Sequence, residues 1–360
     1  MKGLVLLAAG GTGGHLFPAE ALAFALAARG WTIHLATDHR IESYGRHFPA
    51  EAIHYIRSAT ITRSPVAGAR ALFCLATGLL QARLLIRRLK PAAAIGFGGY
   101  PTVPPILAAV GRVPTIIHEQ NAVFGRANRF LAPHVTRIAT SVPDVGGTEK
   151  MKDRVVLTGN PVRTAVIAAA AMPYPVRGAA DPFRLMVFGG SQGAQFLSDV
   201  VPSAVAMLGR DVQARMRITQ QCRPEDIGRV RQAYELLGVE AELLPFFEDL
   251  PKRIAAAHLV VSRSGASTCA ELAVIGRPAI MVPLPHALDQ DQKANAEVLA
   301  SAGAGWMIPQ AELTPQRLAA ELERFVNGPE RLAQAAAAAR AISRPDAVDR
   351  LADLVEKVAA

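Results

Sequence analysis

Two glycine-rich segments are the residues of this sequence best suited to hold an anion. Residues 10–15 follow the apolar run 4–9, residues 189–194 follow the apolar run 184–188, and a helical pattern comes after each segment. A glycine turn between a strand and a helix lets backbone N–H groups and the helix dipole face a phosphate. The sequence therefore predicts phosphate or diphosphate binding at two places. Tight strand–helix packing without a ligand is the alternative.

The two glycine segments do not fit the common nucleotide fingerprints. In the G-x-G-x-x-G pattern that binds dinucleotides, Leu16 stands where the third glycine should be, and neither segment ends in G-K-[ST]. These departures disfavour a nicotinamide-dependent enzyme and a P-loop ATPase.

Two further polar clusters in the first half follow apolar runs. Residues 96–101 contain three glycines and Tyr100, and residues 118–121 read His-Glu-Gln-Asn. Because ligands of open parallel sheets bind beyond the carboxyl ends of the strands, we expect both clusters beside the first glycine segment. The alternative for residues 118–121 is a hydrogen-bonded turn that caps the sheet edge.

The second half repeats this arrangement. Residues 262–271 read as a strand end, a turn and a helix start, and Glu271 is suited to pair with two ribose hydroxyls. Polar residues 289–295 enter another helix. Arg163, near the middle of the chain, offers a fixed positive charge for a diphosphate.

Short apolar runs alternate with helical patterns along the whole chain, which predicts the α/β class with parallel sheets covered on both faces. The alternation pauses at residues 161–177, and the two strand–glycine–helix openings echo each other. We therefore expect two doubly wound, Rossmann-like domains that face a cleft. The expected domains are residues 1–162, with a C-terminal helix at 341–360 packing back on them, and residues 163–340.

Composition narrows the function classes. The chain has 360 residues, 51% hydrophobic and 19% charged, with a net charge of +9. Residues 1–160 carry 18 Lys and Arg against 8 Asp and Glu, whereas residues 161–360 carry 21 against 22, so the basicity lies in the first half. Aromatic residues make up only 6% and no basic–aromatic platform occurs, which argues against nucleic acid.

The three cysteines form no C-x-x-C pair, so we expect neither a disulfide framework nor a zinc site. The N-terminal apolar run is too short for a signal peptide, and prolines and glycines break the charge-free stretch 91–111. A soluble or peripheral protein is expected.

Six segments occur in the order found in the MurG family, and the resemblance spans essentially the whole chain. These segments are residues 10–15, 118–121, 158–163, 189–194, 263–271 and 292–295. The resemblance implies a GT-B fold and an inverting transferase with no cofactor. Such an enzyme moves N-acetylglucosamine from UDP-N-acetylglucosamine to the 4-hydroxyl of N-acetylmuramic acid in lipid I. The product, lipid II, serves peptidoglycan synthesis, and with it cell-wall biogenesis, cell shape and cell division.

The resemblance also implies partners and a location. The partners are UDP-N-acetylglucosamine, the undecaprenyl-diphosphate-linked lipid I, an anionic phospholipid surface and other cell-wall synthesis proteins. The enzyme would work peripherally at the cytoplasmic face of the plasma (inner) membrane. Residues 70–90 fit this location, because Arg83, Arg87 and Lys90 share a helical face flanked by leucines. Ordinary packing of an amphipathic helix is the alternative.

Carried over by motif, the site residues form three groups. The catalytic candidates are His15 and Glu119, and Tyr100 joins them on the acceptor side. The other substrate contacts are Thr12, Gly13, Gly14, Asn121, Arg163, Ser191, Gln192, Phe247, Ala266, Ser267, Thr268, Glu271, Gln292 and Asn295. Phe247 stands where the family usually has an aliphatic residue near the uracil. The segment before Asn295 carries one extra residue, and counting back from Asn295 selects Gln292 as the sugar contact.

The residues suggest a metal-free mechanism. Arg163 and the N–H groups around Ser191 could stabilise the leaving diphosphate in place of a divalent cation. The D-x-D pattern at residues 289–291 lies deep in the second half, so we interpret it as coincidence. His15 is favoured as the general base because its ordinary pKa suits the task, and Glu119 is the alternative.

Two other function classes stay open at this point. A nucleotide-sugar sensor without catalysis would need the loops but not the cluster of His15, Tyr100, Glu119 and Asn121. A UDP-sugar epimerase, or a glycolipid transferase with another acceptor, is the nearest enzymatic rival. UDP release that depends on added lipid I separates all three.

Overall fold

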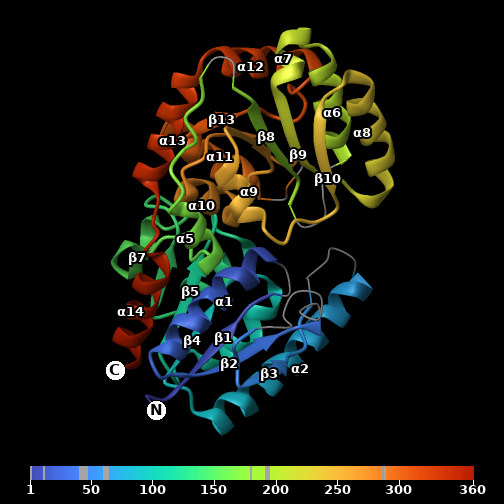
Figure 1. Ribbon diagram of the computed structural model, residues 1–360. Coiled ribbons are helices and arrows are strands. Elements are labelled where there is room, and N and C mark those ends of the chain that lie inside the picture. The colour runs from blue at the N-terminus through green and yellow to red at the C-terminus, as the bar shows by residue number, and fades with distance from the viewer. Residues whose placement is uncertain are drawn as a thin grey trace. The chain divides into compact units, whose positions relative to one another are not determined.

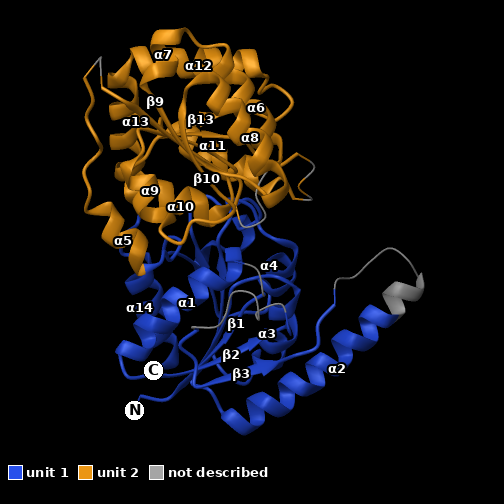
Figure 2. Ribbon diagram, turned by 45° about the vertical axis from the view of Figure 1, so that its right-hand side comes forward, with its two compact units in different colours: residues 1–163, 344–360 blue, residues 164–343 orange. Residues whose placement is uncertain are grey.

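The structure is a computed structural model that describes residues 2–10, 13–39, 48–59, 65–178, 181–190, 195–285, 287 and 289–360, with backbone alone for 65–69. The chain divides into two compact units, Met1–Arg163 with Arg344–Ala360, and Thr164–Ser343 (Figure 2). The sequence predicts these boundaries at residues 162 and 340.

In the described part of unit 1, seven parallel strands form one sheet in the order β3-β2-β1-β4-β5-β6-β7 (Figure 1). The sequence order reverses between β1 and β4, which makes their carboxyl ends the expected ligand position. The strands are β1 (Leu4–Ala8), β2 (Thr32–Thr37), β3 (Ala52–Tyr55), β4 (Ala93–Gly96), β5 (Thr115–Glu119), β6 (Arg137–Thr140) and β7 (Val155–Leu157).

Helices cover both faces of this sheet. They are α1 (Gly13–Ala28), α2 (Pro65–Leu89), η2 (Tyr100–Thr102), α3 (Val103–Ala109), α4 (Arg126–Leu131), η3 (Glu149–Arg154) and α14 (Ala347–Ala359). Val5 and Leu7 of β1 belong to the core that includes α1 and α14, whereas Leu6 and Ala8 belong to the core that includes α2 and α3. Strand β1 is continuously apolar because its alternate side chains enter two cores.

Unit 1 is completed by a segment from the end of the chain. Helix α14 packs against α1 and β4, and Arg29 pairs with Asp349 at 3.0 Å and Asp353 at 2.6 Å. The expected helix at 341–360 is interrupted, since one helix ends at Ile342 and α14 begins at Ala347. Pro345 lies in the break, where it disfavours helical geometry for the residue before it.

Unit 2 contains, in its described part, six parallel strands in the order β10-β9-β8-β11-β12-β13. The strands are β8 (Phe183–Phe188), β9 (Met216–Gln221), β10 (Glu240–Leu244), β11 (Leu259–Ser262), β12 (Ala279–Met281) and β13 (Gly305–Met307). Its helices are α5 (Thr164–Ala170), α6 (Gln195–Ala206), α7 (Arg210–Arg215), α8 (Pro224–Leu237), α9 (Leu250–Ala256), α10 (Ala266–Ile275), α11 (Asp291–Ser301), α12 (Pro315–Asn327) and α13 (Pro329–Ile342).

The predicted class, two doubly wound parallel sheets, is confirmed. Four strands were not among the apolar runs identified in the sequence: β3, β9, β10 and β13. Strands β3 and β10 are partly exposed edge strands, β9 is half polar and β13 has three residues. Each therefore lacks the apolar run that marks a central strand.

Helix α5 forms within the expected linker and packs on α9 and α10. Over the described residues, none of the helices is both long and apolar enough to cross a membrane.

Candidate functional site

In unit 1, three segments meet where the adjacent strands β1, β4 and β5 end. The N–H of Gly10, after β1, donates to the carbonyl of Gly98, after β4, at 3.3 Å. The side-chain amide of Gln120, after β5, donates to the carbonyl of Phe97 at 2.9 Å. The strand order thus brings together the first glycine segment, the second glycine cluster and residues 118–121, as the sequence predicted.

His15 lies in the first turn of α1, and its half-buried side chain lies beside two glycines, Gly98 and Gly99. A Cβ atom built on Gly98 would lie 3.1 Å from His15 Cε1, and one built on Gly99 would lie 3.3 Å from His15 Cδ2. Both glycines have left-handed φ angles, 89° and 76°, which other residues rarely adopt. The glycine cluster therefore leaves the space that the imidazole fills.

Gly13 and Gly14 open the same helix, at the end where backbone N–H groups and the helix dipole favour an anion. Gly14 is exposed, whereas Gly13 is buried beside the ring of Phe17. Thr12, the remaining predicted residue of this segment, lies outside the described residues.

Glu119 is enclosed by four hydrogen-bond donors. Its Oε1 accepts from the backbone N–H and the side-chain amide of Asn121, both at 3.1 Å. Its Oε2 accepts from the N–H of Gly125 at 3.1 Å and from Asn128 Nδ2 at 2.8 Å. Burial raises the pKa of this carboxyl group, and the four hydrogen bonds act in the opposite direction. This arrangement suits a carboxylate that holds residues 121–128 in place.

His118 and Gln120 are buried at the carboxyl end of β5 and form hydrogen bonds there. His118 is fully buried, its Nε2 lies 2.9 Å from the carbonyl of Gly159, and its Nδ1 lies 3.1 Å from Gln120 Nε2. Burial lowers the pKa of His118 to about 4, so the ring is neutral and donates through Nε2. The hydrogen-bonded turn considered in the sequence analysis is what these two residues form. Asn121 is the residue of the four that is partly exposed.

Arg163 and Tyr100 extend the site from two sides of unit 1. The guanidinium carbon of Arg163 lies 4.7 Å from the centre of the Phe17 ring, one turn into α1. Stacking over an aromatic face orients a guanidinium. Tyr100 is half-buried in η2, directly after Gly98 and Gly99, and lines an apolar cavity.

In unit 2, the second glycine segment is fastened by Gln221 at the end of β9. Gln221 Oε1 accepts from the N–H of Gly189 at 3.1 Å, and its Nε2 donates to the carbonyl of Pro245 at 3.1 Å. Gly190 has a φ angle of 90°. Ser191 and Gln192, both predicted substrate contacts, lie outside the described residues.

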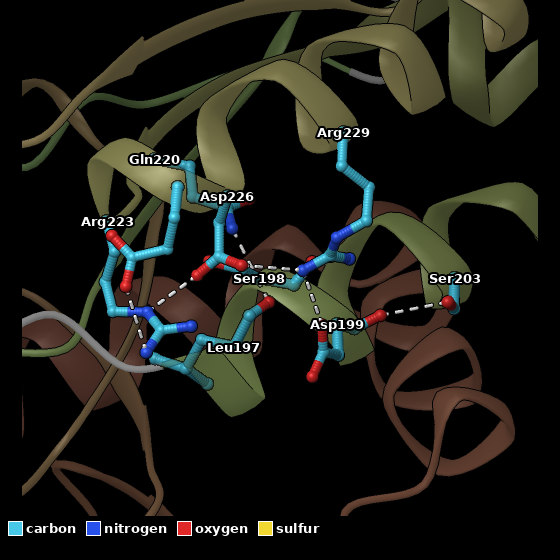
Figure 3. Close-up of polar contacts among 9 residues, drawn as sticks. Leu197, Ser198, Asp199, Ser203, Gln220, Arg223, Asp226 and Arg229 are labelled. Atoms are coloured by element: carbon cyan, nitrogen blue, oxygen red, sulfur yellow. Dashed lines mark hydrogen bonds and ion pairs between the residues drawn. The ribbon is translucent and has the colours of Figure 1, made fainter.

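An ion-pair network anchors α6, the helix that follows this glycine segment (Figure 3). Asp226 of α8 accepts from Arg223 at 2.8 Å and from Arg229 at 3.0 Å, and Arg229 also pairs with Asp199 of α6 at 2.7 Å. Hydrogen bonds from Arg223 and Arg229 hold the pKa of the Asp226 carboxyl below its usual range. The network fixes α6 to α8 one turn after α6 begins.

The start of α10 carries the predicted contacts Ala266, Ser267, Thr268 and Glu271. Glu271 is buried, and the Ser267 hydroxyl is buried with no hydrogen-bond partner among the described residues. The helix begins after Gly265, and the N–H groups of its first turn have no acceptor within the helix. The turn can therefore offer both hydroxyl and backbone donors.

Helix α11 is tied to the turn before α10. Ser264 Oγ donates to the carbonyl of Gln292 at 2.8 Å, and Asn295 Nδ2 donates to the carbonyl of Ser264 at 3.2 Å. Gln292 Oε1 accepts from the N–H of Leu284 at 2.9 Å, so the carboxamide has a fixed direction. The structure thus brings Gln292 and Asn295 close to the start of α10.

Phe247 is buried, and the guanidinium carbon of Arg253 lies 4.6 Å from its ring centre. The neighbouring Phe246 is instead 64% exposed. Of the two aromatic side chains, Phe246 is the one whose ring is accessible to a flat ligand.

The D-x-D residues show no metal-like grouping. Asp291 begins α11, and its Oδ1 accepts from the N–H of Gln292 at 2.9 Å, as a helix-start residue does. Among the described residues, no group of three or more His, Cys, Asp or Glu side chains converges as metal ligands do.

Four residues of the site region were missed by sequence reasoning: Asn128, Gln221, Arg263 and Phe246. Arg263 is buried and donates to the carbonyls of Val282 and Pro283 at 3.0 and 3.2 Å and to Gln310 Oε1 at 2.6 Å. Its position inside a matched motif could have suggested a role. The partners of Gln221 and Asn128 lie in other elements of the fold, so no local sequence pattern indicates these contacts.

Comparisons with known proteins fit this architecture. Residues 5–140 match the glycosyltransferase family 28 N-terminal domain, and residues 184–351 match the family 28 C-terminal domain. With two doubly wound sheets, the matches define a glycosyltransferase of the GT-B class.

A curated relative from Allorhizobium ampelinum is 56% identical over 99% of this chain and 96% of its own length. It is named UDP-N-acetylglucosamine--N-acetylmuramyl-(pentapeptide) pyrophosphoryl-undecaprenol N-acetylglucosamine transferase. The crystal structure of Acinetobacter baumannii MurG is similar with a TM-score of 0.80, at 30% identity and 99% coverage of both chains. The chain belongs to the MurG family.

Similarity of the fold alone extends beyond this family. A UDP-GlcNAc 2-epimerase from Neisseria meningitidis, bound to UDP-GlcNAc, has a TM-score of 0.66 at 14% identity, covering 98% of this chain and 100% of its own. At that identity the likeness concerns architecture and carries no argument about the reaction.

Proposed function

We propose that this enzyme transfers N-acetylglucosamine from UDP-N-acetylglucosamine to lipid I, giving lipid II for peptidoglycan synthesis. The acceptor atom is the 4-hydroxyl of N-acetylmuramic acid, and the anomeric configuration inverts. The observation that carries the proposal is the 56% identity with a transferase of that name over 99% of the chain. The cluster around His15, Tyr100 and Asn121 supports it, because a sensor that only binds a UDP-sugar needs no acceptor side.

Unit 1 is the proposed acceptor unit and unit 2 the proposed donor unit. His15 accepts the proton of the attacking hydroxyl as the new C–O bond forms and the bond from the anomeric carbon to UDP breaks. Glu119 is a positioning residue, because its carboxylate is already occupied by four donors. His15 is half-buried in the first turn of α1, beside the backbone of Gly98 and Gly99.

The proposed donor contacts are the residues carried over by motif. They are Thr12, Gly13, Gly14, Asn121 and Arg163 in unit 1, and Ser191, Gln192, Ala266 to Thr268, Glu271, Gln292 and Asn295 in unit 2, where the exposed ring of Phe246 replaces the buried Phe247. Arg163 and the N–H groups before α6 stabilise the UDP diphosphate as it leaves. Glu271 accepts from the ribose hydroxyls, and the Gln292 amide donates to the sugar.

We also propose that the enzyme works peripherally on the cytoplasmic face of the plasma membrane, beside other proteins of cell-wall synthesis. The exposed face of α2 supports this location, since Leu72, Phe73, Leu80 and Leu84 are 58–70% exposed and Arg83 and Arg87 lie between them at helical spacing. Neutralising Arg83, Arg87 and Arg88 should weaken binding to anionic vesicles and spare UDP binding. Unchanged vesicle binding would contradict this location.

The transfer itself is tested with UDP-N-acetylglucosamine and a short-chain lipid I analogue, with and without a chelator. We expect UDP release that requires the lipid and survives the chelator. His15→Ala should lower kcat by about 100-fold or more, the loss typical for a general base, with UDP affinity retained. UDP release without lipid would indicate hydrolysis of the donor, conversion of the donor to another UDP-sugar without UDP release would indicate epimerisation, and near-normal turnover of His15→Ala would remove His15 as the base.

A further inference from the structure

Unit 1 contains an apolar cavity of about 530 Å³ between α2, the η2–α3 segment and α4. Leu75 and Leu79 of α2 face Val103 and Leu107 of α3 across it. Among the described residues that line the cavity, Tyr100 and Arg126 are the two with polar groups. A volume of this size is typical of sites that bury a small molecule or part of one.

The polar end of this cavity adjoins the segments that hold the proposed catalytic groups. Tyr100 directly follows Gly98 and Gly99, on which His15 rests. Arg126 directly follows Gly125, whose N–H donates to Glu119. A ligand that fills the cavity therefore has its polar end beside the acceptor side of the site, and Arg126 places a positive charge there.

The cavity also borders the exposed apolar face of α2. Leu72 and Phe130 both line the cavity and are 62% and 54% exposed. Phe73, Leu80 and Leu84 continue the same exposed surface along α2. The residues that line the cavity thus include a cationic side chain, Arg126, and part of an apolar surface suited to lipid.

We propose that this cavity binds the isoprenoid units of the acceptor nearest its diphosphate, an inference that rests on the proposed function. A flexible apolar chain with an anionic head matches an apolar cavity with Arg126 at one end and an exit onto an apolar surface. The cavity then acts as a chain-length-sensitive subsite, separate from the docking of α2 onto a membrane.

The test compares two soluble acceptor analogues with the same sugar–peptide–diphosphate head, one with a single isoprene unit and one with four, without vesicles or detergent. Because each buried methylene contributes about four-fold in affinity, kcat/KM should favour the longer chain by at least ten-fold. Ala76→Trp, which fills the cavity, and Leu79→Gln, which makes its wall polar, should each abolish that preference. Both should leave the affinity for UDP unchanged.

Leu84→Gln is the matched control, because Leu84 is 58% exposed on the same helix and is not among the residues that line the cavity. It should weaken vesicle binding and keep the chain-length preference. The proposal fails if the wild type transfers equally to both acceptors, if both cavity variants keep the preference, or if Leu84→Gln loses it. Absence of transfer to either acceptor would instead overturn the proposed function.

Discussion

The side-chain amide of Asn128 donates a 2.8 Å hydrogen bond to Glu119 Oε2, and the two residues come from α4 and the end of β5. With Gly125 on the same oxygen and Asn121 on the other, the carboxylate closes the turn between these elements. An acidic side chain that follows a strand in a transferase invites the role of general base. The four donors around the carboxylate favour the positioning role proposed for Glu119 instead.

Glu119→Gln should therefore lower stability as well as activity. The glutamine puts an NH2 group where two donors already point, which leaves buried donors without acceptors at a cost of about 2 kcal/mol. We expect a lower free energy of unfolding and a higher KM for the acceptor, measured by urea titration and steady-state kinetics. A variant of wild-type stability that has lost only kcat would restore Glu119 as the base.

Gly98→Ala should impair turnover by displacing His15. The new methyl group would lie 3.1 Å from the imidazole at a backbone φ of 89°. Gly111→Ala is the matched control, because Gly111 has a φ of 72° and its added methyl group would meet nothing within 4 Å. Both variants should lose about 1 kcal/mol of stability from backbone strain. A fall in kcat in both variants alike would separate the glycine cluster from catalysis.

Phe17→Leu should weaken UDP binding through Arg163. The substitution keeps α1 apolar at this position but removes the ring that lies 4.7 Å from the guanidinium. A cation–π contact at a partly exposed site is worth about 0.5–1 kcal/mol, so we expect UDP to bind about two- to five-fold more weakly. Phe24→Leu, at a half-exposed ring on the same helix, should bind UDP as the wild type does. Titration calorimetry with UDP compares the two, and equal affinities would contradict the role of Phe17.

Stability should fall with acid between pH 6.5 and 4 because of His118. Burial lowers the pKa of His118 in the folded protein to about 4, while the unfolded chain protonates near its ordinary 6.5. The unfolded state therefore binds more protons within this window, and the free energy of unfolding decreases by up to about 3 kcal/mol as the pH falls through it.

His118→Asn should flatten this dependence, measured as urea midpoints across the window. It should not abolish it, because burial also lowers the pKa of His258 to about 4. A slope that His118→Asn does not alter would mean that His118 takes up its proton in the native state.

The fold class could be predicted because the signals that indicate it lie in short stretches of the sequence. A central strand must be apolar on both faces, and the glycine turn after it must approach a helix start, so β1, β4, β5, β8 and β11 could be recognised as residues were read in order. Parallel strands then place their carboxyl ends at one edge, which is why Gly10, Gly98 and Gln120 could be expected together.

What could not be predicted depends on contacts between elements. The stacking of Arg163 on Phe17 and the bond from Asn128 to Glu119 need the folded positions of helices whose sequences give no sign of them. The cavity beside Tyr100 arises only because α2 packs on α3, and helical periodicity cannot specify which leucines line a space. Phe247 was expected from its motif position, yet it is buried, with Arg253 stacked on its ring and paired with Asp249.

The closure of unit 1 by α14 has a consequence for the order in which the protein forms. Residues 344–360 are synthesised after all of unit 2, yet Arg29 and Trp31 of unit 1 bond to Asp349, Asp353 and Glu356. Unit 2 is continuous in sequence and can fold as it emerges from the ribosome, since domains generally fold as units. The unit whose strands are made first is therefore the last to be completed, and the face of α1 that α14 covers is exposed throughout translation of unit 2.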